Sequence, residues 1–238
     1  MPKKSMPKET PDNNSRPLTI ALSKGRILDD TLPLLQHANL VPAEDVKTTR
    51  KLMVDGPSLD GTPVRFLIIR AADVCTYVEQ GAADLGIVGR DILLEHTPDV
   101  YEPLDLKIGV CRLCVCGPKD RVESGKPRQG SRIKVATKYD HIAEQHFLKH
   151  GVQAEIIHLY GSMELAPLVG MADRIVDVVE TGGTLRANGL VEETTLYDIS
   201  SRLIVNPASF ATRKAIIQPM IEKLREAVAL NTAAKADT

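Results

Sequence analysis

The sequence predicts an α/β fold of two doubly wound lobes around a central cleft, and three of its features support that class. Short apolar segments alternate with amphipathic ones from Leu18 to Val205, which is the pattern of strands joined by crossover helices. After Asp105 the order of elements starts again. The motif Gly-Ala-Ala-Asp at 81–84 returns as Gly-Met-Ala-Asp at 170–173. We therefore expect two similar lobes, with ligands bound between them.

Composition argues against several classes of function. The 238 residues carry a net charge of −1, so there is no global electrostatic reason to expect nucleic acid or a membrane surface as a partner. Hydrophobic residues make up 43% of the chain, but no apolar run approaches the roughly 20 residues that a bilayer requires. Residues 1–17 are polar and lack the apolar core of a signal peptide. We expect a disordered tail there and a cytoplasmic protein.

The four cysteines could suggest a metal site, because three of them follow the spacing C-x2-C-x-C. However, Cys114 and Cys116 fall within the apolar run Gly109–Cys116, and the period of a strand places both on one face. We therefore interpret them as core residues, with no metal held by the protein and no disulfide bonds.

The first lobe begins with a strand at Leu18–Leu22, followed by an amphipathic helix in which Pro33 predicts a kink or a late start. The Gly- and Pro-rich stretch 55–63 predicts a loop or a hairpin. The remaining elements of this lobe are strands at 64–70 and 83–88, a helix that Asp73 caps, and a helix opened by residues 89–91.

The second lobe repeats this alternation. Its predicted strands are 132–137, 154–159 and 175–179, and its helices are 140–150 and 165–169. We expect residues 193–205 to return to the first lobe as strands and 212–228 to pack there as an amphipathic helix. The predicted division is a first lobe of 18–107 plus 186–230, a second lobe of 108–185, and a disordered tail at 231–238.

The stretch around residue 180 has the features of a phosphate site. The apolar run Ile175–Val179 ends abruptly in Thr181-Gly182-Gly183-Thr184. Glycines permit positive φ and close backbone approach, and a helix start supplies N–H groups to an anion. Asp177, four residues before Thr181, is placed to accept hydrogen bonds from sugar hydroxyls. The pattern predicts a ribose 5-phosphate pocket, whereas a Gly-Gly pair alone would also fit an ordinary strand-to-helix turn.

A second candidate follows the first strand. The turn Ser23-Lys24-Gly25-Arg26 is small, basic and contains glycine, as expected of a phosphate site at the carboxyl edge of a parallel sheet. Taken alone, it would equally fit a solvated surface turn.

The Thr-Gly-Gly-Thr loop resembles the phosphoribosyl-pyrophosphate (PRPP) loop of phosphoribosyltransferases, although salvage enzymes usually have two adjacent acids where this chain has Val176 and Asp177. Motifs at 21–26, 81–89, 160–167 and 177–190 together resemble the catalytic subunit of ATP phosphoribosyltransferase. The resemblance spans roughly residues 18–209. It implies lobes like those of periplasmic solute-binding proteins, and transfer of phosphoribosyl from PRPP to adenine N1 of ATP with release of pyrophosphate, the first step of histidine biosynthesis.

The resemblance also implies roles for residues. Arg26 and Arg50 match catalytic arginines at the pyrophosphate, where a guanidinium stays charged and binds phosphate oxygens as a fork, and Lys24 would be a third cation. Glu164 would contact ribose or adenine. Mg2+ is expected to bind mainly through the substrate pyrophosphate. The implied substrate-binding residues are Ser23, Lys24, Gly25, Glu164, Asp177, Glu180, Thr181, Gly182, Gly183 and Thr184.

The expected partners follow from the short form of this family, because the 29 residues after Ser209 are too few for an independent regulatory domain. That form implies a homodimer core assembled with a regulatory subunit related to histidyl-tRNA synthetase, in a hetero-octamer that responds to histidine. The alternatives are a solute-binding or effector-sensing module without catalysis, and salvage or anthranilate phosphoribosyl transfer. The lack of a signal peptide or helix-turn-helix disfavours the module, and Val176 and the lobe repeat disfavour the other transferases.

Overall fold

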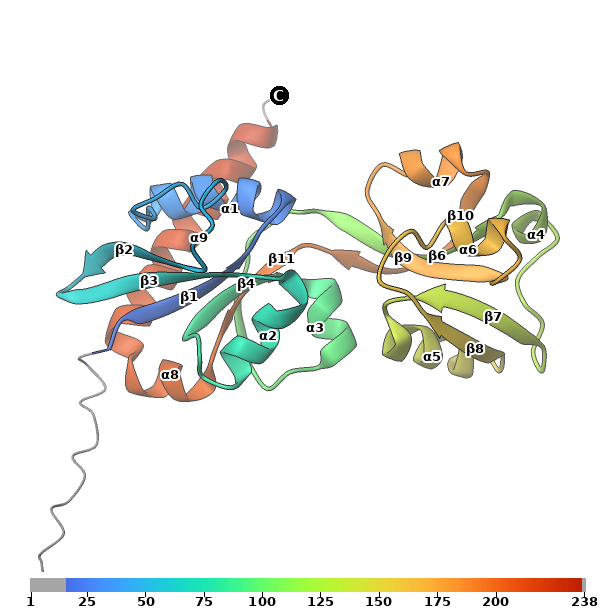
Figure 1. The fold of residues 1–238 in the computed structure, drawn as a ribbon, viewed down its shortest axis with the longest axis horizontal. Coiled ribbons are helices and arrows are strands. Elements are labelled where there is room, and N and C mark those ends of the chain that lie inside the picture. Colours follow the sequence, from blue (N-terminus) through green and yellow to red (C-terminus); the bar gives the residue numbers. More distant parts are fainter. Residues whose placement is uncertain (1–15, 237–238) are drawn as a thin grey trace, which may run out of the picture. The chain divides into compact units, whose positions relative to one another are not determined.

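The computed structural model describes residues 16–236, which divide by their contacts into two units (Figure 1). The first unit contains residues 16–87, 99–106 and 203–236, and the second contains 88–98 and 107–202. Residues 1–15 of the predicted tail lie outside the described residues. Arg16 and Pro17 are placed, and their carbonyl oxygens accept hydrogen bonds from the guanidinium of Arg213 at 2.8 and 3.0 Å.

The first unit is built on a six-stranded sheet in the order β2-β3-β1-β4-β11-β5. The central strand β1 runs parallel to β3 and β4, while β2 and β3 form an antiparallel hairpin. Helix α1 packs against α9, and α2 packs against β1. The elements are β1 (Leu18–Ser23), α1 (Arg26–His37), β2 (Met53–Leu59), β3 (Thr62–Ile69), α2 (Ala71–Glu79), β4 (Leu85–Gly89), β5 (Tyr101–Asp105), β11 (Ser201–Val205), α8 (Pro207–Thr212) and α9 (Lys214–Ala236).

The second unit is built on a five-stranded sheet in the order β10-β6-β9-β7-β8. Strand β7 runs parallel to β8 and β9, β6 is antiparallel to β9, and β10 is antiparallel to β6. The elements are α3 (Arg90–His96), β6 (Cys111–Pro118), α4 (Lys119–Glu123), β7 (Arg132–Thr137), α5 (Asp140–Lys149), β8 (Gln153–His158), α6 (Leu165–Leu168), β9 (Arg174–Val179), α7 (Gly183–Ala187) and β10 (Leu190–Ile199).

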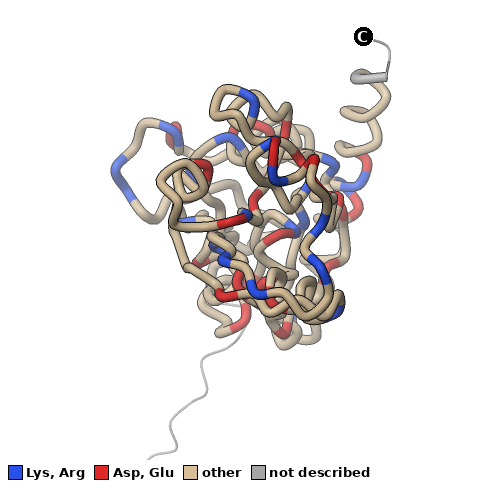
Figure 2. The backbone as a smooth tube through the Cα atoms, turned by 90° about the vertical axis from the view of Figure 1, so that its right-hand side faces the viewer, with Lys and Arg blue, Asp and Glu red and all other residues tan. Residues whose placement is uncertain are grey.

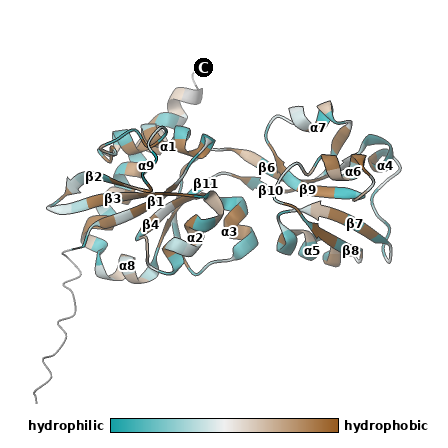
Figure 3. Cartoon of the chain, in the orientation of Figure 1, coloured by the Kyte–Doolittle hydropathy of each residue, from teal (hydrophilic) through white to brown (hydrophobic). Residues whose placement is uncertain are grey.

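Both faces of this second sheet are covered, because neighbouring residues of one strand belong to different cores. Leu113 and Val115 pack with Val135 and Val176, whereas Cys114 and Cys116 pack with Ala136, Met163 and Ile175. Figure 3 shows hydrophobic residues, in brown, along the strands of this sheet. The prediction that Cys114 and Cys116 share one buried strand face is confirmed.

The repeat predicted from the sequence is present in the structure. In each unit one strand, β1 or β7, lies between two parallel partners. The turn that leads into the third parallel strand contains a left-handed glycine in both cases, Gly81 with φ 71° and Gly170 with φ 73°. The predicted α/β class with two doubly wound units is therefore confirmed.

Several local predictions need correction. Strand β10 pairs with β6 in the second sheet, so residues 186–200 do not return to the first lobe as predicted, whereas β11 does. The helix opened by residues 89–91, which was predicted in the first lobe, belongs to the second unit. The alternating pattern that identifies a strand does not specify which sheet it joins. Helix α9 continues through Ala236, so residues 231–236 are not a disordered tail. Their alanine-rich sequence favours helix propagation.

Two helix starts also differ from expectation. Helix α1 begins at Arg26 and includes Pro33, so it does not start late. Helix α2 has Arg70 at its N-cap, and Asp73 lies in the first turn, where a carboxylate still favours the positive end of the helix.

Candidate functional site

In the second unit, three loops leave the sheet at one edge. The parallel register aligns Thr137 in β7 with His158 in β8 and with Val176 in β9. The loops that follow these strands therefore begin side by side, at the edge where parallel sheets bind ligands. They contain Lys138, the turn 160–164 and the loop 180–184. The second-unit residues predicted for the site thus lie at one edge of the sheet.

The loop after β9 turns at Gly182, which is left-handed with φ 70° and ψ 12°. Gly183 does not share this conformation, and it is the first residue of α7. Thr181 and Thr184 are exposed, and the Thr181 hydroxyl accepts the Gly183 N–H at 3.4 Å. Helix α7 has five residues, so its macrodipole is small and the backbone N–H groups would supply most of the attraction for an anion.

Two arginines that sequence reasoning missed contact the backbone of this loop. Arg112 Nη1 donates to the carbonyl oxygen of Glu180 at 3.2 Å, and Arg186 Nη1 donates to that of Thr181 at 2.9 Å. Arg112 lies in β6, directly opposite Val179 in the strand register. Because 68 residues separate Arg112 from Glu180 along the chain, no sequence pattern indicated this contact.

Two of the predicted carboxylates, Asp177 and Glu164, share one neighbourhood. Asp177 is half-buried in β9, and its Oδ1 accepts the Val178 N–H at 2.8 Å. Burial raises the pKa of the Asp177 carboxyl, Lys138 opposes that rise, and the charge of Glu164 adds to it. Glu164 itself is half-buried at the start of α6. The charge of Glu164 thus acts on Asp177, so the two carboxylates belong to one electrostatic neighbourhood.

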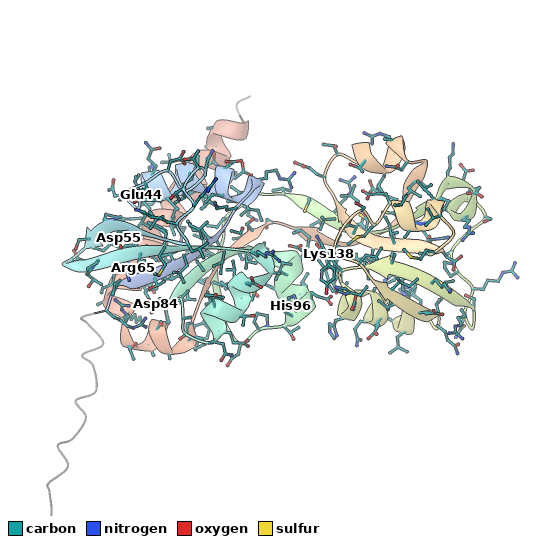
Figure 4. All side chains as sticks on the ribbon, viewed as in Figure 1. Glu44, Asp55, Arg65, Asp84, His96 and Lys138 are labelled. Carbon is teal, nitrogen blue, oxygen red and sulfur yellow. The ribbon has the colours of Figure 1, made fainter. Side chains whose placement is uncertain are left out.

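Lys138 is a cation of this neighbourhood that the sequence did not single out (Figure 4). It follows Thr137, whose hydroxyl donates to the Val176 carbonyl at 2.7 Å and accepts the Tyr139 N–H at 2.9 Å. Lys138 Nζ lies 4.9 Å from the centroid of the Tyr139 ring. Lys138 directly follows β7, the strand between two parallel partners, as Lys24 directly follows β1 in the first unit. This correspondence is the signal that could have identified it.

In the first unit, the basic turn after β1 depends on a glycine. Gly25 has φ 107° and ψ −163°, a region that only glycine adopts readily. Its carbonyl oxygen accepts the Leu28 N–H at 2.9 Å, which starts α1. Ser23, at the end of β1, is buried, whereas Lys24 and Arg26 are exposed.

The fold brings two of the predicted cations together. Lys24 Nζ donates to the carbonyl oxygen of Thr49 at 3.0 Å, and Arg50 is the next residue and is exposed. Arg26 follows Lys24 by two residues, at the start of α1. We call Lys24, Arg26 and Arg50 the basic region of the first unit. Elsewhere charges of both signs are interspersed along the chain (Figure 2).

The described residues contain no cluster of three or more His, Cys, Asp or Glu side chains that could hold a metal ion. In the same part of the chain, no helix is long and apolar enough to cross a membrane.

Comparison with known proteins gives the family. The family model for ATP phosphoribosyltransferase (HisG) matches residues 70–226. The chain belongs to the ATP phosphoribosyltransferase family. A relative of that name from Halorhodospira halophila is 56% identical over 214 residues, which cover 90% of this chain and 96% of the relative. Another from Pseudomonas fluorescens is 55% identical over 212 residues, or 89% and 97% of the two chains.

Solved structures agree with this family assignment. The ATP phosphoribosyl transferase (HisG:HisZ) complex from Thermotoga maritima matches with a TM-score of 0.75 and 29% identity, over 89% of this chain and 98% of that one. The periplasmic aliphatic sulphonate binding protein SsuA from Escherichia coli matches with a TM-score of 0.58 and 13% identity, over 93% and 76%. The second likeness shows the fold alone, so it confirms the predicted periplasmic-binding-protein architecture without supporting a solute-binding function.

Proposed function

We propose that this member of the ATP phosphoribosyltransferase family transfers the phosphoribosyl group of PRPP to adenine N1 of ATP and releases pyrophosphate, as the first step of histidine biosynthesis. The observation that carries the proposal is the 56% identity to a relative of that name across almost its whole length. The site residues described above supply groups suited to this reaction.

The reaction separates charge, which defines what the residues have to do. When the bond between the anomeric carbon and pyrophosphate breaks, positive charge develops on the ribose and negative charge on the leaving group. In the second unit, we propose that the loop 180–184 binds the 5-phosphate through its N–H and hydroxyl groups. Asp177 would bind the ribose hydroxyls, and Glu164 would contact ribose or adenine. Catalysis would then come mainly from positioning and charge stabilisation.

The first unit supplies the cations. We propose that Arg26 and Arg50 bind the pyrophosphate oxygens and stabilise their growing charge, with Lys24 as a third cation. Ser23 and Gly25 would shape the turn, and the open surroundings of Gly25, with no atom within 4 Å of a Cβ built there, are compatible with close approach of a phosphate.

Mg2+ would neutralise pyrophosphate charge in this reaction. The residues fit an ion held mainly by the substrate, because the described chain offers no carboxylate cage of its own and Mg2+ commonly binds through phosphates with one or two protein carboxylates.

The proposed assembly is a homodimer core with a regulatory subunit related to histidyl-tRNA synthetase, in a cytoplasmic hetero-octamer. It is supported by the HisG:HisZ complex, of whose matched chain this protein covers 98%. We expect histidine to inhibit only when that subunit is present, because allostery requires a second site whose ligand distinguishes two states.

The proposed function is tested by incubating the protein with PRPP, Mg2+ and each of several acceptors, and by measuring the pyrophosphate that is released. ATP should support release and form phosphoribosyl-ATP, whereas adenine and anthranilate should not. Activity with either of those and none with ATP would contradict the proposal. A histidine titration with and without the regulatory subunit then tests the assembly, and strong inhibition of the isolated chain would contradict it.

A further inference from the structure

Two guanidiniums hold the proposed phosphate loop from one side. Arg112 binds the carbonyl oxygen of Glu180 and Arg186 binds that of Thr181, at 3.2 and 2.9 Å. These carbonyls are consecutive, and none of the described peptide bonds is cis. In a trans peptide the N–H points away from its carbonyl. The N–H groups of Thr181 and Gly182 therefore point to the side opposite the guanidiniums, as donors for an anion need to do.

Arg112 is itself held by a carboxylate. Its Nε donates to Glu192 Oε2 at 2.8 Å and its Nη2 to Glu192 Oε1 at 2.6 Å, which is the bidentate geometry that fixes a guanidinium plane. Cys114 Sγ donates to the same carboxylate at 3.5 Å. The third donor group, Nη1, is thereby aimed at the loop. Lysine could not make these bonds together, because it lacks the planar fork.

Glu192 also lies beneath the turn of the loop. Its Oε1 is 3.5 Å from a Cβ built on Gly182, and Arg186 Nη1 is 3.0 Å from the same point. Hydrogen bonding to Arg112 lowers the pKa of the Glu192 carboxyl, and the charge of Arg186 lowers it further. The Glu192 carboxylate therefore lies close to both of the guanidiniums that donate to the loop carbonyls.

We propose that Arg112, held by Glu192, is a positioning residue that orients the peptide groups of the loop for the 5-phosphate of PRPP. It acts through the loop backbone and does not touch the substrate. This inference rests on the function proposed above. A purely structural ion pair would affect both substrates and stability alike, whereas this arrangement predicts a defect confined to the phosphoribosyl substrate.

The test compares Arg112→Lys and Glu192→Gln with a matched control, Arg132→Lys. Arg132 also pairs with a glutamate in the second unit, Glu155 at 3.0 Å, but it is exposed on β7. Each Arg112 or Glu192 variant should raise the KM for PRPP about tenfold, as expected for a lost charged hydrogen bond. The KM for ATP should stay within about twofold and the double variant should be no worse than the single ones, because the pair acts as one unit. The control should match the wild type.

Calorimetry with ribose 5-phosphate as the probe separates this inference from the proposed function. A folded Arg112→Lys protein with wild-type PRPP kinetics and wild-type ribose 5-phosphate affinity would overturn the inference, and so would equal rises in both KM values with a lowered Tm. If the wild type transfers nothing to ATP, the function fails. In that case, the positioning role of Arg112 is still supported if the wild type binds ribose 5-phosphate tightly and Arg112→Lys weakens that binding. If the wild type does not bind ribose 5-phosphate, the positioning role is overturned as well.

Discussion

The two units use the same turn to hold the strand that lies between two parallel partners, β1 in the first unit and β7 in the second. In the first unit the Asp84 N–H donates to the Thr19 carbonyl at 2.8 Å, and the Asp84 carboxylate accepts the Thr19 N–H at 2.8 Å. In the second unit the Asp173 N–H donates to the Lys134 carbonyl at 2.8 Å, and its carboxylate accepts the Lys134 N–H at 2.9 Å. The repeated motif therefore forms the same two-bond clasp in both places.

The surroundings of the two carboxylates differ. Asp84 (Figure 4) is fully buried and accepts hydrogen bonds from Arg213, also fully buried, at 3.0 Å and from the Ser209 hydroxyl at 2.6 Å. The side chain of Asp173 is 38% exposed and pairs with Arg121, which is 48% exposed. The shared motif thus specifies the backbone hydrogen bonds. The elements packed around each aspartate determine how much its ion pair contributes to the free energy of unfolding.

The largest expected effect comes from Asp84→Asn. Asparagine can still accept the Thr19 N–H, but it leaves the buried guanidinium of Arg213 without a counter-charge. Breaking a buried pair from one side costs about 3–5 kcal/mol. Urea unfolding followed by circular dichroism measures the loss in free energy of unfolding, and a loss below about 1 kcal/mol would show that burial does not distinguish the two clasps.

The comparison extends to function, because the basic region of the first unit and the loop of the second are proposed to bind different phosphates. Arg26→Ala and Arg50→Ala should each lower kcat about 10² to 10³-fold, as removal of a preorganised donor to growing charge does. Arg65→Ala is the control, since Arg65 forms an exposed pair with Asp55 at 3.1 Å in the same unit. If only the KM for PRPP rises, the arginines bind ground state and transition state equally.

A smaller effect is expected in the loop of the second unit. Gly182→Ala should raise the KM for PRPP about tenfold, because a non-glycine residue in the left-handed region costs about 1–2 kcal/mol and its Cβ would meet Arg186 at 3.0 Å. Gly183→Ala should have little effect on loop geometry, since its Cβ would meet only the Thr181 hydroxyl at 3.6 Å. Steady-state kinetics at saturating ATP distinguishes the two, and equal defects would place the critical backbone conformation elsewhere.

The smallest effect is expected for Asp173→Asn. The clasp keeps an acceptor for the Lys134 N–H, and the exposed pair with Arg121 is worth about 0–1 kcal/mol. The same urea titration measures the loss in free energy of unfolding, and this loss should be smaller than the loss for Asp84→Asn. A loss as large as that of Asp84→Asn would mean that the charge of the acceptor for the strand N–H, and not the buried pair with Arg213, sets the cost of both substitutions.

The sequence by itself determined the features that depend on local pattern. The apolar run Ile175–Val179 and the glycines of the following loop specify a buried strand and a turn, because side-chain alternation and positive φ are properties of the local backbone. The Gly-x-Ala-Asp repeat predicted two similar units for the same reason. Together with the order of the motifs, these features were enough to predict the α/β class and the family, and they suggested candidate site residues in both units.

Only the tertiary structure decided what those elements contact. Strand β10 joins the second sheet, and Arg112 reaches Glu192 across 80 residues of chain. Asp84 is buried against Arg213, 129 residues away, although the repeated motif gives no sign that it differs from Asp173. Such contacts depend on which strands pair and on which helices cover them, and these choices are set by the packing of the whole unit, so no short stretch of sequence records them.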